Sequence, residues 1–289
     1  MNHPTPDTAL LDAHHAHGHD TGDQAEILDL DAEVLAEHTA SLVAWLPVGS
    51  APRHIVDLGC GTGAGTFALL ERFPEAEVTA VDSSAVHLRR LREKAAAAGA
   101  AERVRVVHAD LDAARWPGLG TPDLVWASAS LHHMADPDRT LRQVHDLLSP
   151  GGLFAVVELA GFPRFLPADA PEGAPGLEER CHAALARHHA ERVPHRGTDW
   201  AAELTEAGFT VERERTVRVA LGPSRSEATG RYARSSLRRM RGGVASTLTA
   251  EGLAVLDQLL DDDSPDSILR RDDLTVRTER TVWAARRTR

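Results

Sequence analysis

Cysteine and aromatic residues are scarce in this chain. Only Cys60 and Cys181 are cysteines among its 289 residues, and aromatic residues make up 4% of the sequence. Two isolated thiols cannot build a disulfide framework, so we expect both to be reduced and neither to act as a nucleophile.

Positive charge and long apolar runs are also lacking. The chain holds 32 Lys and Arg against 43 Asp and Glu, a formal net charge of −11, which leaves no broad cationic surface for phosphates. No run of residues is long and apolar enough to span a membrane, and the polar start over 1–20 lacks the apolar core of a signal peptide. We therefore expect a cytoplasmic protein that binds neither nucleic acid nor membrane.

A regular alternation of short apolar runs and amphipathic segments begins near residue 54. A hydrophobic content of 42% supplies a sizeable core for it. The pattern predicts strands at 54–58, 77–81, 104–109, 123–127 and 153–159, with helices at 64–73, 85–98 and 137–148 between them. Such alternation is typical of an α/β fold with a doubly wound, Rossmann-like parallel sheet.

The segment 55–66, IVDLGCGTGAGT, joins the first of these strands to its helix. One acid, one cysteine and three alternating glycines are its candidate ligand contacts: Asp57, Cys60, Gly59, Gly61 and Gly63. Glycines let a backbone turn tightly and approach a ligand, and the start of the helix offers unpaired N–H groups. The loop predicts a nucleoside cofactor, although the dinucleotide fingerprint G-x-G-x-x-G/A fits it as well.

Two later acids help to decide between cofactors. Asp82 closes the second strand about 20 residues past the loop, where a carboxylate can accept the ribose hydroxyls of either cofactor. Asp110, followed by Leu111, closes a third strand at the edge where an adenine would be held. The set of Asp57, Asp82 and Asp110 favours S-adenosylmethionine over a nicotinamide dinucleotide.

With these acids in place, the chain resembles the class I S-adenosylmethionine-dependent methyltransferases of the small-molecule type, such as quinone and sugar O-methyltransferases. VDLGCGTG matches the first motif of that family, Asp82 the acidic second motif and Asp110 the third, and residues 123–159 resemble the segment that follows. The resemblance implies a seven-stranded sheet that ends in an antiparallel pair, here strands 209–219 and 274–285, and a helical cap formed by insertions.

The resemblance also implies a set of cofactor contacts. The expected residues are His19, Asp57, Gly59, Cys60, Gly61, Gly63, Asp82, Ser83, Asp110, Leu111, Ala127 and Ser128. His19 stands where many members carry a tyrosine that closes over the cofactor. The histidines within 14–19 offer a metal site as an alternative, but no set of carboxylates or cysteines completes it, so we expect none.

Candidate catalytic residues follow the fourth and fifth strands. His132 and His133 lie near the position at which the family holds the methyl group, and imidazole can take a hydroxyl or amine proton near neutral pH. Glu158 ends the fifth strand, where it could orient a histidine or hold a polar acceptor. The alternative for His132 and His133 is that one of them caps a helix or packs against the cofactor. The alternative for Glu158 is a solvated carboxylate at the end of the strand.

Two other features favour structural roles. Trp126 is interpreted as a core residue rather than a cofactor contact. A basic face at helical spacing is expected to be solvated or paired with acids near 261–263 rather than to bind substrate. Its members are Arg231, Arg234, Arg238, Arg239 and Arg241.

These residues predict an enzyme that transfers the methyl group of S-adenosylmethionine to a small-molecule acceptor, at oxygen. Nitrogen and carbon acceptors are alternatives, although Ala127-Ser128-Ala129-Ser130 replaces the N-P-P-Y signature of N-methylation. A non-catalytic S-adenosylmethionine-binding protein and a nicotinamide-dependent oxidoreductase are the remaining alternatives. The sequence is compatible with an oligomer.

The chain divides into four segments on this interpretation. Residues 1–50 are expected to form an N-terminal lid with leading helices, and 51–160 the S-adenosylmethionine-binding core. A Pro- and Gly-rich break begins a cap insertion at 161–197. Residues 198–289 are expected to complete the core, with a helical cap insertion at 222–271.

Overall fold

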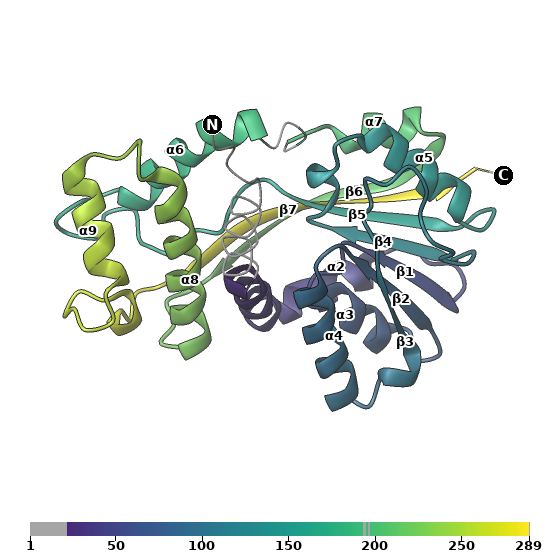
Figure 1. Ribbon diagram of the computed structural model, residues 1–289, viewed down its shortest axis with the longest axis horizontal. Coiled ribbons are helices and arrows are strands. Elements are labelled where there is room, and N and C mark those ends of the chain that lie inside the picture. Colours follow the sequence, from purple (N-terminus) through teal and green to yellow (C-terminus); the bar gives the residue numbers. More distant parts are fainter. Residues whose placement is uncertain (1–21, 193–194, 196, 289) are drawn as a thin grey trace, which may run out of the picture.

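A seven-stranded sheet runs through the computed structural model, which describes residues 22–192, 195 and 197–288 (Figure 1). The strand order is β3-β2-β1-β4-β5-β7-β6. The strands are β1 (His54–Leu58), β2 (Glu77–Asp82), β3 (Val104–His108), β4 (Leu124–Ser128), β5 (Leu153–Leu159), β6 (Phe209–Leu221) and β7 (Val276–Arg287). The first five are parallel and β7 is antiparallel to both β5 and β6, which confirms the predicted Rossmann-like sheet with its antiparallel pair.

The five parallel strands end at one edge of the sheet. Pairing places Leu58 beside Val81 and Ala127, and Ser128 beside Val157. The central strands β1, β4 and β5 are largely buried apolar runs, as expected for a sheet covered on both faces. The loops that follow them therefore meet at the carboxyl edge, where ligands bind in open α/β sheets.

Helices cover both faces of the sheet. One face carries α2 (Ala36–Trp45), α3 (Ala64–Arg72) and α4 (Ala85–Ala97), and the other carries α5 (Pro137–Leu147) and α7 (Trp200–Glu206). Polar side chains cap the amino ends of α4 and α5. The Ser84 hydroxyl accepts the N–H of His87 at the start of α4, and Asp136 accepts that of Arg139 at the start of α5.

A second group of helices lies beyond the carboxyl edge, at the end of β6 and β7 that is away from the C-terminus (Figure 1). It contains α6 (Leu177–Arg192), α8 (Glu227–Val244), α9 (Ala250–Leu260) and a helix over 22–34, which we call helix 22–34. Their apolar faces share one buried cluster, which includes Leu30, Leu237 and Leu256. α6 lies within 161–197, and α8 and α9 lie within 222–271, the two segments expected to contribute helices to the cap.

Cys60 and Cys181 are both free thiols, as the composition predicts, and both side chains are buried. Burial raises the pKa of both thiols, to about 11 for Cys181, so neither forms a thiolate readily. Among the residues that the structure describes, no helix is both long and apolar enough to cross a membrane.

Candidate cofactor and active site

The glycine loop after β1 adopts backbone conformations that favour glycine. Gly59, Gly61 and Gly63 have φ of +67°, +53° and +100°. A Cβ atom at Gly59 would lie 2.5 Å from the Cβ of Ser130, so the loop also packs too closely there for a side chain. The Ser130 hydroxyl donates to the carbonyl of Leu58 at 3.0 Å and thereby ties the segment after β4 to this loop.

Asp57 lies beneath the glycine loop and is 2% exposed. Its Oδ2 accepts the hydroxyl of Thr66 at 2.6 Å. Burial raises the pKa of Asp57 to about 7, although the Thr66 hydrogen bond acts in the opposite direction. Trp126, its neighbour on β4, is 1% exposed within the core, so the structure places this side chain as predicted.

Asp82 ends β2 and is held as a carboxylate. The N–H of Gly61 donates to its Oδ2 at 2.9 Å and that of Ser84 to its Oδ1 at 2.7 Å. Burial favours the neutral form, but His87 and these two N–H groups outweigh it and lower the pKa of Asp82. The result is an ionised acceptor in contact with the glycine loop.

His87 was not predicted from the sequence, yet it borders this acid. Its Nδ1 lies 3.4 Å from Oδ1 of Asp82, and its Nε2 has no hydrogen-bond partner among the described residues. Thr62, within the glycine loop, has an equally unpaired and buried hydroxyl. Buried polar atoms without partners are rare in proteins. These groups therefore fit a polar nucleoside cofactor at this edge of the sheet.

The turn after β3 lies next to Asp82. Ala109 donates its N–H to the carbonyl of Asp82 at 3.1 Å, and Asp110 accepts the N–H of Asp112 at 2.9 Å. Leu111 is buried, whereas Asp110 is exposed. The structure thus brings the predicted pair Asp110 and Leu111 to the strand end that carries Asp82.

The segment after β4 is held in an unusual conformation. Ala127 is buried at the end of the strand and Ser128 is half-buried. Ala129 has a φ of 52°, a left-handed conformation that a residue with a Cβ adopts at some cost. Its N–H donates to the carbonyl of Val157 at 2.8 Å, which fixes the turn against β5.

His132 and Glu158 form a buried pair at this point. Nδ1 of His132 lies 2.5 Å from Oε2 of Glu158, and the two residues are 4% and 6% exposed. The other carboxylate oxygen accepts the N–H of Leu131 at 2.9 Å. His133 is exposed, and its ring centroid lies 4.1 Å from that of His132. Glu158 therefore contacts His132 directly, and the ring of His133 lies beside that of His132, tilted by 44°.

Helix 22–34 covers the glycine loop. A Cβ atom at Gly61 would lie 3.1 Å from Cδ1 of Leu28. Asp29 accepts hydrogen bonds from Arg90 at 2.6 Å and Lys94 at 2.5 Å, both on α4. The predicted cofactor contact His19 and the proposed lid that contains it lie outside the described residues. The covering helix that the structure does describe was not predicted to contact the loop.

The same helix is joined to the cap. Asp31 accepts the hydroxyl of Tyr232 on α8 at 2.6 Å and a bidentate pair of hydrogen bonds from Arg280 on β7 at 2.7 and 2.8 Å. Glu26 pairs with Arg231 of α8 at 2.8 Å. Helix 22–34 thus bridges the glycine loop and the cap.

Part of the basic face of α8 is paired with acids, and one of these, Asp262, belongs to the predicted run 261–263. Arg234 contacts Asp262 at 2.7 Å and Arg241 contacts Asp257 at 2.8 Å. Within the described part of the chain, no group of three or more His, Cys, Asp or Glu side chains is placed to hold a metal ion.

Known proteins resemble the core of this chain. A family model described as a methyltransferase domain matches residues 56–154, which contain the glycine loop, Asp82 and His132. A trans-aconitate 2-methyltransferase of Acidovorax sp. (strain JS42) is 40% identical over 123 residues, which cover 42% of this chain and 45% of that protein. The chain thus spans less than half the length of this protein and of the similar trans-aconitate 2-methyltransferases of Methylobacterium radiotolerans and Acidovorax ebreus.

Solved structures resemble more of the chain. A putative methyltransferase from Bacillus halodurans C-125 has a TM-score of 0.54 and 18% sequence identity, and the match covers 87% of this chain and 99% of that one. The [4+2]-cyclase SpnF has a TM-score of 0.50 at 18% identity, covering 88% of this chain and 82% of that one. At these identities the likeness shows the fold alone, and one of the two proteins is named as a cyclase.

Proposed function

We propose, on the premise that this chain contains a class I S-adenosylmethionine-dependent methyltransferase domain, that it transfers the methyl group of S-adenosylmethionine to an oxygen of a small-molecule acceptor. The premise rests on the family match over 56–154 together with the seven-stranded sheet and its antiparallel pair. The observation that carries the activity is the buried contact between His132 and Glu158 beside the glycine loop.

The carboxyl edge supplies suitable contacts for this cofactor. Asp82 is an ionised acceptor for the ribose hydroxyls, and Gly59, Gly61 and Gly63 let the chain approach the ligand. When bound, S-adenosylmethionine supplies an electrophilic methyl group on a positively charged sulfur. Burial raises the pKa of Asp57 to about 7, and the positive charge of a bound S-adenosylmethionine would favour the ionised form of this acid. We assign the other predicted contacts by position, namely Cys60, Ser83, Asp110, Leu111, Ala127 and Ser128.

His132 is assigned as the general base. Its Nδ1 faces Glu158, so Nε2 is the nitrogen that can take the proton of an acceptor hydroxyl as the oxygen is methylated. Glu158 orients the ring, because its second oxygen is fixed by the N–H of Leu131. His133 is assigned to packing against His132, since its ring is exposed and the two ring centroids lie 4.1 Å apart.

Alignment and exclusion of water are the other tasks of the chain. Methyl transfer is a displacement that needs the acceptor in line with the methyl group. Helix 22–34 covers the glycine loop and is tied to α8 through Asp31, so core and cap can hold the two substrates together. The name of the relative in Acidovorax gives trans-aconitate as its substrate, which supports a small-molecule acceptor here.

Methyl-labelled S-adenosylmethionine tests this proposal. The protein is incubated with separate panels of phenols, sugars, small carboxylic acids and amines, and products are identified by mass spectrometry and NMR. Transfer of the label to oxygen, with loss of transfer in His132→Ala, is the expected result. Transfer only to nitrogen or carbon would contradict the oxygen assignment, and cofactor binding without transfer in any panel would favour a non-catalytic binding protein.

A further inference from the structure

The ring of His87 has one polar contact among the described residues, and that contact is Asp82. The side chain is 6% exposed, Nδ1 lies 3.4 Å from Oδ1 of Asp82, and Nε2 has no hydrogen-bond partner. A buried polar ring with an unpaired nitrogen is less favourable than an apolar side chain of similar size. Packing alone therefore does not explain a histidine at this position, whereas the contact with Asp82 does.

The start of α4 fixes the position of this ring. Ser84 is the N-cap of the helix, and its hydroxyl accepts the N–H of His87 at 3.3 Å. The N–H of Ser84 itself donates to Oδ1 of Asp82 at 2.7 Å. The acid, the cap and the ring thus form a closed circuit of contacts over residues 82–87. Because the cap uses the backbone N–H of His87, a change of its side chain leaves the cap intact.

The orientation of the Asp82 carboxylate depends on such contacts. The torsion about the bond from Cβ to the carboxylate of an aspartate has a broad minimum, so the side chain alone does not define it. Gly61 donates its N–H to Oδ2 at 2.9 Å, while Ser84 and His87 contact Oδ1. A carboxylate accepts about four hydrogen bonds. The three contacts therefore orient the group and leave room for a ligand.

The contact with His87 also keeps this acid ionised. Burial by itself raises the pKa of Asp82. The contact with His87 is the largest of the effects that lower it, ahead of the N–H groups of Ser84 and Gly61, and together they hold the pKa below its usual value. Burial, and after it the charge of Asp82, raises the pKa of Asp57 to about 7. Two acids thus compete for negative charge at this edge, and His87 favours the charge on Asp82.

We propose that His87 is a positioning residue for the cofactor: it holds the Asp82 carboxylate in the orientation that accepts the ribose hydroxyls. Its Nδ1 faces the acid, so His87 acts on the cofactor through Asp82. The proposal rests on the cofactor named in the proposed function, and it is independent of the acceptor and of the His132–Glu158 pair.

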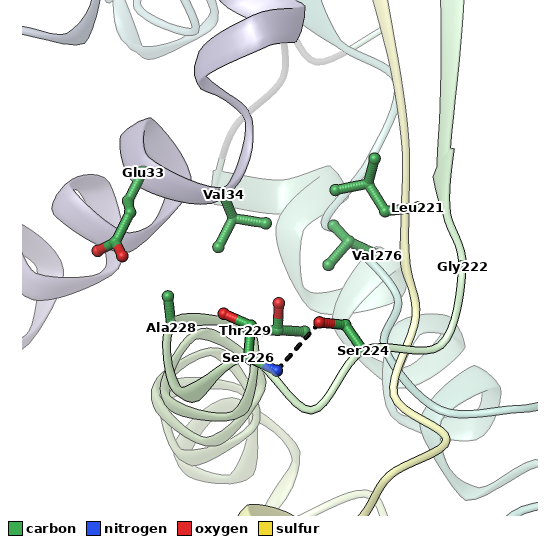
Figure 2. Close-up of a pocket in the computed structure, with 9 residues that line it drawn as sticks. All are labelled: Glu33, Val34, Leu221, Gly222, Ser224, Ser226, Ala228, Thr229 and Val276. Atoms are coloured by element: carbon green, nitrogen blue, oxygen red, sulfur yellow. Dashed lines mark hydrogen bonds between the residues drawn. The ribbon is translucent and has the colours of Figure 1, made fainter.

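The pocket between helix 22–34 and the amino end of α8 includes neither of these residues (Figure 2). Its volume of ≈ 230 Å³ is also below the roughly 300–1,000 Å³ of sites for drug-sized ligands. A ligand in that pocket would not respond to a change at His87. An effect of His87 on cofactor affinity would therefore locate the cofactor at Asp82.

Calorimetric titration of the full chain with S-adenosylhomocysteine tests the proposal. His87→Leu is expected to weaken binding by about fivefold to tenfold, the effect of one lost hydrogen bond. His87→Asn keeps an N–H donor at the position of Nδ1 and should bind within about twofold of the wild type. His145→Leu is the matched control, because it also removes a histidine beside an aspartate, 3.7 Å from Asp146, and should bind as the wild type does.

Two further titrations separate positioning from a structural role. Because His87 acts through Asp82, adding His87→Leu to Asp82→Ala should weaken S-adenosylhomocysteine no further. The 2′,3′-dideoxy analogue of S-adenosylhomocysteine lacks both hydroxyls, so it should bind His87→Leu and the wild type equally. A structural defect would instead weaken both ligands and add to the effect of Asp82→Ala.

The outcomes distinguish this proposal from the cofactor assignment. Unchanged binding of S-adenosylhomocysteine in His87→Leu, or an equal loss for the dideoxy analogue, would overturn the role of His87 and leave the cofactor assignment in place. No binding of S-adenosylhomocysteine to the wild type would overturn both.

Discussion

Nδ1 of His132 lies 2.5 Å from Oε2 of Glu158, although 26 positions separate the two residues in the sequence. The contact depends on the turn after β4, in which Ala129 has a φ of 52°. Strained conformations of this kind persist where surrounding contacts hold them, often at functional sites. Here the N–H of Leu131 and the hydroxyl of Ser130 hold the turn, so the structure presents one orientation of the His132 ring.

Removing the base is expected to slow the reaction without loss of the cofactor. His132→Ala should lower kcat by about 10²- to 10⁴-fold, the usual contribution of a general base, and leave the affinity for S-adenosylhomocysteine nearly unchanged. Steady-state kinetics on the identified acceptor and calorimetry measure the two quantities.

The double variant tests whether the two residues act as one unit. Because Glu158 acts through His132, adding Glu158→Ala to His132→Ala should lower kcat little further. His133→Ala is the matched control and should retain near-normal turnover. Near-normal turnover in His132→Ala would show that catalysis rests on alignment alone, and the pair would then belong to packing.

Cofactor affinity is expected to rise with pH through the ionisation of Asp57. Burial raises the pKa of this acid to about 7, and a cationic cofactor favours its charged form, so binding releases a proton below that pH. The affinity for S-adenosylmethionine should therefore be higher at pH 8 than at pH 6. Below the pKa it should increase by up to about tenfold per pH unit, and above the pKa it should level off. Calorimetry in buffers of different ionisation enthalpy measures the proton release. An equal pH dependence in Asp57→Asn would contradict this assignment.

The contact of Asp31 with the cap is expected to stabilise the fold. Tyr232→Phe removes one hydrogen bond to a charged group but leaves the bidentate contact with Arg280, so the free energy of unfolding should fall by about 1.5 kcal/mol. Denaturant unfolding measures this change. As a control, Arg225→Met breaks the exposed pair with Asp272 and should change stability by less than about 0.5 kcal/mol. A similar small effect of Tyr232→Phe would show that helix 22–34 is not held by this contact.

The elements of the sheet could be predicted because local signals agree with the fold. Each parallel strand is an apolar run that ends in a polar or glycine-rich segment, and the predicted strand at 153–159 matches β5 at both ends. His132 and Glu158 could be selected as candidates because His132 follows β4, Glu158 lies near the end of β5, and these paired parallel strands end at the same edge. Their direct contact could only be seen in the structure.

Other parts of the site have no local signal. Asp29 and Asp31 read as exposed acids of an amphipathic helix, and their partners Lys94 and Arg280 lie 65 and 249 positions away. Ala129 does not belong to the residue types that commonly adopt positive φ, so its conformation follows from tertiary contacts. His87 borders Asp82 only because α4 packs against β2, which the sequence does not indicate.

Calorimetric titration of S-adenosylhomocysteine and NADH tests the cofactor assignment on which the proposed activity depends. S-adenosylhomocysteine is expected to bind the wild type at one site, and NADH is not expected to bind comparably. Asp82→Ala should weaken S-adenosylhomocysteine by about 1.5 to 3 kcal/mol, because the ribose hydroxyls lose their acceptor. Asp146→Ala, at a side chain 85% exposed, should leave the affinity unchanged. Tighter binding of NADH than of S-adenosylhomocysteine, or an unaltered affinity in folded Asp82→Ala, would contradict the account.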